Sequence, residues 1–448
     1  MSIQRKFALV ALVAAMPWVS AQAQSAAELQ KEIASLKASL QALQQKVEAM
    51  ANKPDAMALP QQVNRLEQRL DLAEDESEKA GFKGLKISGT MEVGYATNNG
   101  TAGHLFGASS GSVTDDRTYS GVGMLQISKE SQGEGVDWTL RLLPGATVEN
   151  MVHEASLSIP LDKTNRLIGG LIPDYQGYEY VFPHANPTLG NQLISHNALY
   201  DYAGATQYAG LGMAHTFDGG KYAFKWLVGN VDAATDTGAD TTKSYFNGSK
   251  SRSVALAYRG DWFVDEFTYI GLSGLHGNAN RNFRVMAVDG GYTHGDWQLN
   301  GQLSSGWMRN AASNGGDAEW TGLSGLVGFK LTPRLQLLAR ADYLENAKNG
   351  GGTYASLQPA APDGTTALDN TANGLGPVRN SDGLNSDDLN AGASLTRLTV
   401  GTNYQLNANT QWKTEYRVDQ SAGYNFVDSN GVATRTRTRI GTSFVLSF

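Results

Sequence analysis

The feature that most constrains this chain is an alternation of apolar and polar residues, which recurs in segments of about ten residues. In the first such segment Leu85 and Ile87 alternate with Lys86 and Ser88. The same period of two recurs at 136–142, 154–159, 221–228, 297–305 and 412–418. Strands of soluble sandwiches are mostly about five or six residues long, whereas a tilted strand of about nine to eleven residues crosses a membrane. The pattern therefore predicts a membrane barrel.

We predict an all-β fold over residues 85–448: a transmembrane antiparallel β-barrel of about 16 strands, preceded by an N-terminal α-helical coiled coil. Barrels with 16 to 18 strands leave an aqueous lumen. Short links alternate with long loops rich in Gly, Asn and Asp, so we expect the short turns in the periplasm and the long loops outside the cell. The strands are expected near 85–96, 118–129, 135–143, 152–160, 165–173, 205–217, 221–230, 251–260, 265–275, 283–294, 296–309, 319–330, 334–344, 393–406, 410–420 and 433–448.

Composition excludes several classes of function. The chain has no cysteine, which rules out thiol nucleophiles, disulfides and cysteine-bound metals. A formal net charge of −7 argues against nucleic-acid binding, which needs a basic surface. After residue 19 no apolar stretch approaches the ~20 residues of a membrane-spanning helix. No cofactor is expected.

The N-terminus has the three regions of a secretory signal peptide. Arg5 and Lys6 precede an apolar stretch at 7–16, and small residues follow at 21–23. We expect cleavage after Ala23, giving a signal peptide over 1–23. The alternative, an N-terminal membrane anchor, is less favoured because the apolar stretch is shorter than a membrane span.

A heptad pattern follows the signal peptide. The apolar positions are spaced alternately by four and three residues, as a and d positions are in a coiled coil. They are Leu29, Ile33, Leu36, Leu40, Leu43, Val47 and Met50. A lone helix of this length is marginal in water, so we predict self-association through a periplasmic coiled coil over 24–52. The alternative is a helix folded back on its own chain. A helical linker is expected over 53–84.

The last strand resembles the C-terminal strand of outer-membrane proteins, the signal that the barrel-assembly machinery reads. Its apolar residues alternate and the chain ends on an aromatic side chain. These residues are Ile440, Phe444, Leu446 and Phe448. The alternative is an edge strand that happens to end in Phe.

The whole pattern resembles the trimeric general and phosphate-selective porins of proteobacteria, and is most similar to the OmpL-like or porin O/P-like group, including betaproteobacterial members. A local similarity to that group runs through 169–173, 177–179, 186, 195–197 and 203–204. Such porins fold the equivalent segment into the lumen as a constriction loop. The resemblance therefore makes candidates of Asp174, Glu179, His184, His196 and Asp201. No lysine ladder or dense arginine cluster stands out in the sequence, so phosphate selectivity is not implied.

Basic residues on the polar face of the predicted strands are candidates for lining the lumen. They are Arg141, Lys221, Lys225, Lys413, Arg417, Arg437 and Arg439. These seven outnumber four acidic residues on the same face (Glu92, Asp137, Glu154 and Glu415), which predicts a modest anion preference. Arg437 and Arg439 have an alternative position at the rim, against lipid phosphates or acidic loops.

These observations favour an outer-membrane porin of a Gram-negative bacterium, a passive diffusion channel for small hydrophilic solutes or ions. We expect a homotrimer whose partners are outer-membrane lipid, lipopolysaccharide and the barrel-assembly machinery. One alternative is a barrel-anchored tethering protein that uses its periplasmic coiled coil. An enzyme ranks third. A metal or catalytic role for His184 and His196, or a Ser-His-Asn lipase arrangement, is disfavoured because no local motif supports either.

Overall fold

The computed structural model describes most of the predicted barrel and little of the chain before it. The described residues are 34, 37–38, 41, 84–98, 117–131, 135–142, 152–173, 175–179, 192–203, 207–231, 254–278, 282–351, 374–428 and 430–448. Two compact units are distinguished, Met1–Leu85 and Lys86–Phe448.

In the first unit, Ala34, Lys37, Ala38 and Gln41 are helical. The expected signal peptide, the seven heptad residues and the linker up to residue 83 lie outside the described residues. Among the residues that are described, no helix is long and apolar enough to span a membrane.

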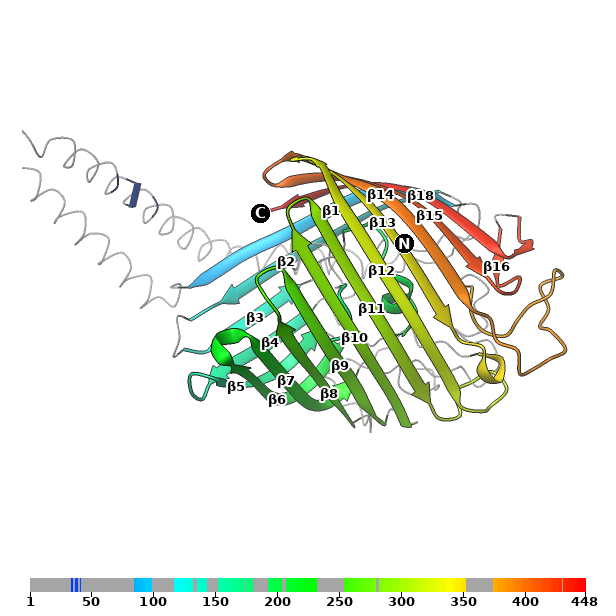
Figure 1. The fold of residues 1–448 in the computed structure, drawn as a ribbon, viewed down its shortest axis with the longest axis horizontal. Helices are drawn as coiled ribbons and strands as arrows, with labels where there is room; N and C mark the ends of the chain where they lie inside the picture. Colours follow the sequence, from blue (N-terminus) through cyan, green and yellow to red (C-terminus); the bar gives the residue numbers. More distant parts are fainter. Residues whose placement is uncertain are drawn as a thin grey trace, which may run out of the picture. The chain divides into compact units, whose positions relative to one another are not determined.

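The second unit is a closed barrel of sixteen antiparallel strands, each hydrogen-bonded to its sequence neighbours in the barrel (Figure 1). The barrel strands are β1 (Leu85–Asn98), β2 (Arg117–Lys129), β3 (Asp137–Leu142), β4 (Val152–Pro160), β5 (Asn165–Pro173), β6 (Gln207–Phe217), β7 (Tyr222–Val231), β8 (Val254–Phe263), β9 (Thr268–Asn278), β10 (Asn282–His294), β11 (Trp297–Met308), β12 (Ala318–Thr332), β13 (Leu335–Glu345), β14 (Leu395–Asn407), β15 (Thr410–Ser421) and β18 (Thr436–Ser447). A separate hairpin pairs β16 (Phe426–Val427) with β17 (Ala433–Thr434).

The predicted sixteen-stranded barrel is confirmed; most strand ends differ from the expected ones by up to three residues, and two of these differences change a connection. The turn expected at 260–264 lies at 264–267, because β8 continues to Phe263 and β9 begins at Thr268. The strand expected over 433–448 is interrupted, since Ala433 and Thr434 pair in the small hairpin and the barrel strand begins at Thr436. Period-two patterns do not mark where a strand leaves the sheet, so these end points were not visible in the sequence.

Strand β18 closes the barrel by pairing with β15 on one side and β1 on the other. The final residue takes part, because Phe448 N–H donates to the Gly89 carbonyl at 3.0 Å and Gly89 N–H donates to the Phe448 carbonyl at 2.9 Å. Ile440, Phe444, Leu446 and Phe448 are all exposed on the outer face. Closure leaves no strand edge unpaired, which a membrane requires of a sheet.

Alternation along each strand separates an apolar outer wall from a mixed inner wall. On β12, Leu323, Val327 and Leu331 are exposed, while the intervening Ser324 and Leu326 are buried. Aromatic residues gather on the outer wall near the short turns, as an interfacial girdle would. They include Trp262, Phe267, Tyr292, Trp297, Trp412 and Phe444.

The inner wall is not uniformly open. Near the long-loop end, inward apolar residues of β8–β14 such as Leu275, Trp320 and Leu344 form one buried cluster. Tyr175 and Leu199 from the β5–β6 connection and Phe426 of β16 pack into the same cluster. This side of the lumen is therefore filled, which restricts any passage to the remaining part.

Candidate functional site

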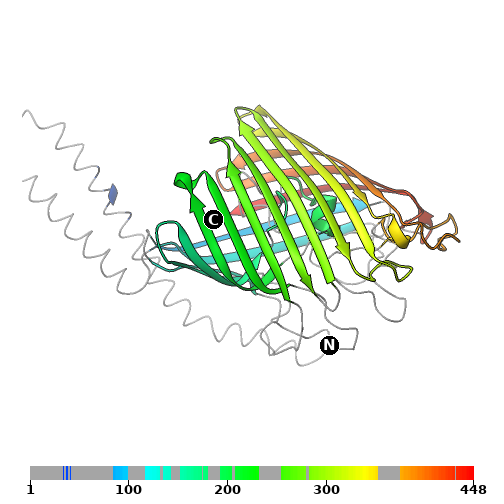
Figure 2. The same cartoon turned by 60° about the horizontal axis from the view of Figure 1, so that its bottom comes forward.

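The connection between β5 and β6 lies inside the barrel. Its described parts are 175–179 and 192–203, the second ending in the short helix α3 (Ala198–Ala203). Figure 2 shows α3 enclosed by the strands. Contacts with inward-facing wall residues confine this inner loop: Tyr178 OH is 2.6 Å from Ser324 Oγ on β12, and Asn403 Nδ2 on β14 donates to the Gln192 carbonyl at 2.9 Å.

Arg340 on β13 joins the two described parts of the inner loop. Its guanidinium pairs with Glu179 Oε1 at 2.8 Å and donates to the carbonyls of Ser195 at 2.9 Å and His196 at 2.6 Å. Glu179 Oε2 in turn accepts from the backbone N–H of Asn197 at 2.5 Å. The side chains of Arg340 and Glu179 are 0% and 1% exposed, so this ion pair is desolvated. The hydrogen bonds of both side chains to the loop backbone fix its geometry.

Two wall carboxylates accept from backbone N–H groups of the inner loop. Glu415 on β15 accepts from Ser195 through both its oxygens, the backbone N–H at 2.8 Å and the hydroxyl at 2.6 Å. Asp342 on β13 accepts from Ala198 N–H at 3.1 Å, at the start of α3. Asn197 caps the same helix, since Tyr200 N–H donates to its Oδ1 at 2.7 Å. Wall side chains thus replace the strand partners that the loop backbone lacks.

The start of the inner loop also requires a glycine. Gly177 has a φ of +77°, a conformation that L side chains rarely adopt, and a Cβ there would lie 2.1 Å from Gln302 Oε1 on β11. On the neighbouring residue, burial against the wall and the adjacent Glu179 carboxylate raise the pKa of the Tyr178 phenol well above its ordinary value. Tyr178 therefore stays protonated and keeps its hydrogen bond to Ser324.

Four arginines gather around one carboxylate on β14, β15 and β18. Asp419 pairs with Arg397 at 2.9 Å, Arg417 at 3.0 Å and Arg437 at 2.8 Å. Arg439 is the register partner of Arg417. Arg397 also donates to the His196 carbonyl at 2.9 Å, which connects the cluster to the inner loop. The sequence indicated Arg417, Arg437 and Arg439 but neither Arg397 nor Asp419, because the members of the cluster come from three strands and meet only through the register.

The opposite part of the inner wall, on β3–β5, is more accessible to water. Arg141 and Glu154 pair at 3.0 Å and remain 14% and 13% exposed. Arg166 and Asp137 pair at 2.5 Å and remain 28% and 31% exposed. The Arg340–Glu179 pair beneath the inner loop is 0% and 1% exposed, so the β3–β5 pairs have more contact with water than this one.

A cavity of about 640 Å³ lies at the short-turn end of the barrel, where residues of β1, β2, β10–β15 and β18 line it. Glutamines dominate its polar lining, and Gln192 brings the inner loop to its edge. They are Gln126, Gln192, Gln298, Gln336, Gln405 and Gln411. Neutral amides both donate and accept hydrogen bonds, so this vestibule suits hydrated solutes of either charge.

The structure separates the predicted loop candidates. Glu179 is buried in the Arg340 ion pair, and His196 stacks on Tyr200 with ring centroids 4.3 Å apart. Asp174 and His184 lie outside the described residues, as does the side chain of Asp201. Within the part of the chain that is described, no group of three or more His, Asp or Glu side chains is arranged to hold a metal ion.

The predicted basic residues lie in four different environments. Arg141 is on the half-exposed β3–β5 wall, whereas Lys413, Arg417, Arg437 and Arg439 are buried on the inner wall of β15 and β18. Lys225 of β7 lies over the Tyr175 ring, 4.2 Å from its centroid. Lys221 is exposed in the short turn before β7.

Comparison with known proteins places this architecture among porins. The profile of the family described as "Putative beta-barrel porin-2, OmpL-like" matches residues 84–448. No protein with a curated description matches the chain.

Solved porins share the fold at low sequence identity. The outer-membrane channel DcaP of Acinetobacter baumannii has 11% identity and a TM-score of 0.50, over 81% of this chain and 97% of that one. An anion-selective porin from Comamonas acidovorans has 9% identity and a TM-score of 0.50, over 81% and 99%. The trimer form of OmpT from Vibrio cholerae has the same four values.

The inner loop's attachment predicts the effect of removing Arg340. Arg340→Met leaves Glu179 and Asp342 buried without their cation, at a cost of about 3 kcal/mol or more. We expect the inner loop to detach from the wall and the single-channel conductance in planar bilayers to rise. Arg334→Met, in the exposed turn before β13, is the matched control and should leave conductance unchanged. An Arg340→Met channel with wild-type conductance would show that the loop is held by other contacts.

Proposed function

The chain belongs to the OmpL-like family of beta-barrel porins. It is an outer-membrane channel protein. We propose the route by which solutes cross its barrel. Small hydrophilic solutes or ions enter through the glutamine-lined vestibule and pass between the inner loop and the β3–β5 wall. The observation that carries this route is the contrast in exposure between the Arg166–Asp137 pair, near 30%, and the Arg340–Glu179 pair, near zero.

Passage is passive in this proposal. The described residues along the route supply hydration partners and fixed charges, and they position no group for chemistry on a solute. Channel activity without enzymatic activity is therefore the function that the site supports. A tethering role for the barrel is less favoured, because the β3–β5 wall keeps water-exposed charged side chains facing the lumen.

The assembly we propose is a homotrimer, with short turns and the 24–52 coiled coil in the periplasm and the long loops outside the cell. The trimer form of the Vibrio cholerae porin, which has the same barrel fold, supports the oligomeric state. The exposed C-terminal aromatic residue and its pairing with β1 support recognition by the barrel-assembly machinery. The apolar outer wall with its aromatic girdle supports contact with lipid and lipopolysaccharide.

The absence of cysteine in the sequence allows a direct test of the route. Ser156 lies on the inner wall of β4 beside Glu154, and its hydroxyl donates to Glu154 Oε1 at 2.6 Å. Ser324 is 0% exposed beneath the inner loop. We expect Ser156→Cys channels to lose conductance on exposure to a bulky charged methanethiosulfonate reagent, and Ser324→Cys channels to be unaffected. The opposite pattern would place the passage on the other side of the loop.

Charge along the route predicts opposite shifts for the two members of one ion pair. Arg141→Gln leaves Glu154 as an uncompensated carboxylate in the lumen, and Glu154→Gln leaves Arg141 as an uncompensated guanidinium. The zero-current potential under a KCl gradient should move toward cation selectivity in the first variant and toward anion selectivity in the second, by several millivolts at low salt. Equal potentials in wild type and both variants would exclude this wall from the conducting path.

The coiled-coil proposal is tested separately from the barrel. Replacing Leu36 and Leu43 by Asp puts charge into the heptad seam, which should abolish self-association of the isolated 24–52 segment in sedimentation experiments. Lys37→Asp, outside the a and d positions, is the control and should retain association. If the wild-type segment is monomeric at high micromolar concentration, the helix packs within its own chain instead.

A further inference from the structure

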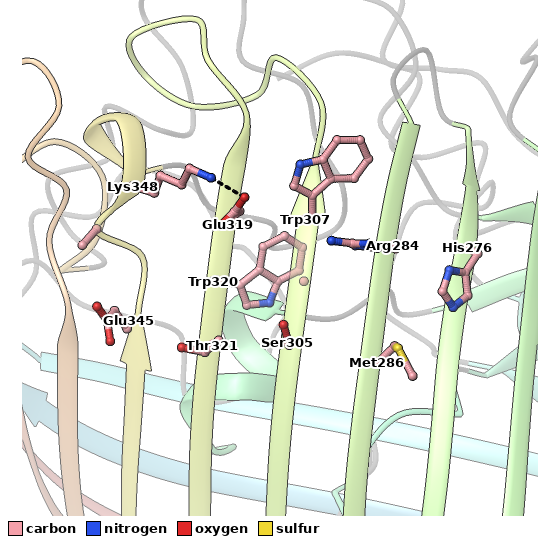
Figure 3. A pocket seen from close by; sticks show the side chains of 12 residues that line it. His276, Arg284, Met286, Ser305, Trp307, Glu319, Trp320, Thr321, Glu345 and Lys348 are labelled. Carbon is pink, nitrogen blue, oxygen red and sulfur yellow. Dashed lines mark hydrogen bonds and ion pairs between the residues drawn. The ribbon is translucent and has the colours of Figure 1, made fainter.

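A row of polar side chains crosses the outer wall near the long-loop end. The register pairs Arg284 of β10 with His276 of β9 on one side and with Trp307 of β11 on the other, and Trp307 with Glu319 of β12. Arg284 is an even number of residues from the exposed Val288 on its strand, and Trp307 is an even number from the exposed Leu303. Their side chains are therefore on the outer face of the sheet, and the row faces away from the lumen. In Figure 3 these side chains stand in front of the strands, with α3 and the blue strands of the opposite wall behind them.

The row borders a cavity of about 410 Å³ on this wall. His276, Arg284, Trp307 and Glu319 line it, together with Met286 below the row and Lys348 from the β13–β14 connection. Every member of the row lies within three residues of its strand's end at the long loops. The cavity therefore lies at the long-loop end of the barrel, with most of its lining residues on the outer wall.

Arg284 is distinguished from its neighbours by what it contacts. Within the described part of the chain Glu319 pairs with Lys348, and the indole N–H of Trp307 donates to Asp317 Oδ2 at 3.2 Å. Arg284 has no carboxylate partner among the described residues. Its guanidinium lies 5.5 Å from the centroid of the Trp307 ring, a cation–π contact beside the cavity that both residues line.

We propose that this cavity binds the phosphate group of an outer-leaflet lipid. Arginine on a lipid-facing wall is tolerated near the interface and is strongly unfavourable deeper, so the position of Arg284 fits an anionic headgroup. A guanidinium binds phosphate oxygens through two parallel N–H donors, so Arg284 carries the recognition, while Lys348 at the rim is paired with Glu319. Met286 and the aliphatic wall below the row would contact the acyl chains.

The orientation used in this inference rests on the proposed function, which puts the long loops outside the cell. In that orientation the headgroups beside Arg284 are those of the outer leaflet. A lipid is favoured over a free anion because the cavity lies on the wall that carries the exposed apolar residues. Glu345 also lines the cavity, so a second copy of the chain is the competing occupant, and the oligomeric state of Arg284→Met separates it from a lipid.

The test uses the purified full-length protein in detergent, titrated with diphosphoryl lipid A and followed by native mass spectrometry. We expect wild type to retain one lipid A per chain and Arg284→Met to weaken binding about tenfold, as loss of one charge-assisted contact predicts. Arg284→Lys should bind with intermediate affinity. Arg309→Met removes an exposed arginine at the same end but outside the cavity, and should bind as wild type does.

Several results would overturn the proposal. Equal lipid A binding by wild type and Arg284→Met, or an equal loss in Arg309→Met, would mean that binding is not at this cavity. Displacement of lipid A by millimolar inorganic phosphate would identify a site for soluble anions, and a change of oligomeric state in Arg284→Met would identify a contact between copies. Single-channel conductance should be the same in all variants, so a channel that does not conduct contradicts the proposed function and leaves lipid binding to be judged by the titration.

Discussion

The hydrogen bonds between wall arginines and the backbone of the inner loop determine how this barrel is filled. A loop inside a barrel takes its peptide groups away from water, and each one then needs a partner. Arg340 and Arg397 supply donors to the carbonyls of Ser195 and His196. Glu415 and Asp342 supply acceptors to the N–H groups of Ser195 and Ala198. These four charged side chains of the wall lie where the backbone of the inner loop needs hydrogen-bond partners.

This use of charge makes the lumen asymmetric. Beneath the inner loop, the Arg340–Glu179 pair is buried, and an apolar cluster around Leu275 and Trp320 lies toward the long loops. On the β3–β5 side, Arg141, Glu154, Arg166 and Asp137 keep contact with water. On the proposed route a solute meets these two cations and two carboxylates.

The outer wall follows a different rule, because lipid gives no partner to an unpaired charge in the hydrocarbon region. Its exposed residues are mainly aliphatic between an aromatic girdle at the short turns and the polar row at the other end. Glu319 is paired with Lys348, and Arg284 rests on Trp307. The same requirement applies to the row as to the inner loop, because a charged group away from bulk water needs a defined partner. For Arg284 we propose that this partner is a lipid phosphate.

Local period-two patterning was sufficient to predict the sixteen strands, because successive side chains of a strand lie on opposite faces of the sheet. It also placed Arg437 and Arg439 opposite Phe444 on the last strand, and the structure has the arginines buried and Phe444 exposed. Only the tertiary structure decided what those arginines contact. Arg397, Arg417 and Arg437 reach Asp419 through pairings among three strands, and Arg340 reaches Glu179 across 161 residues of sequence. Such contacts depend on the shear of the closed sheet and on the path of the inner loop, and neither leaves a periodic signal in the sequence.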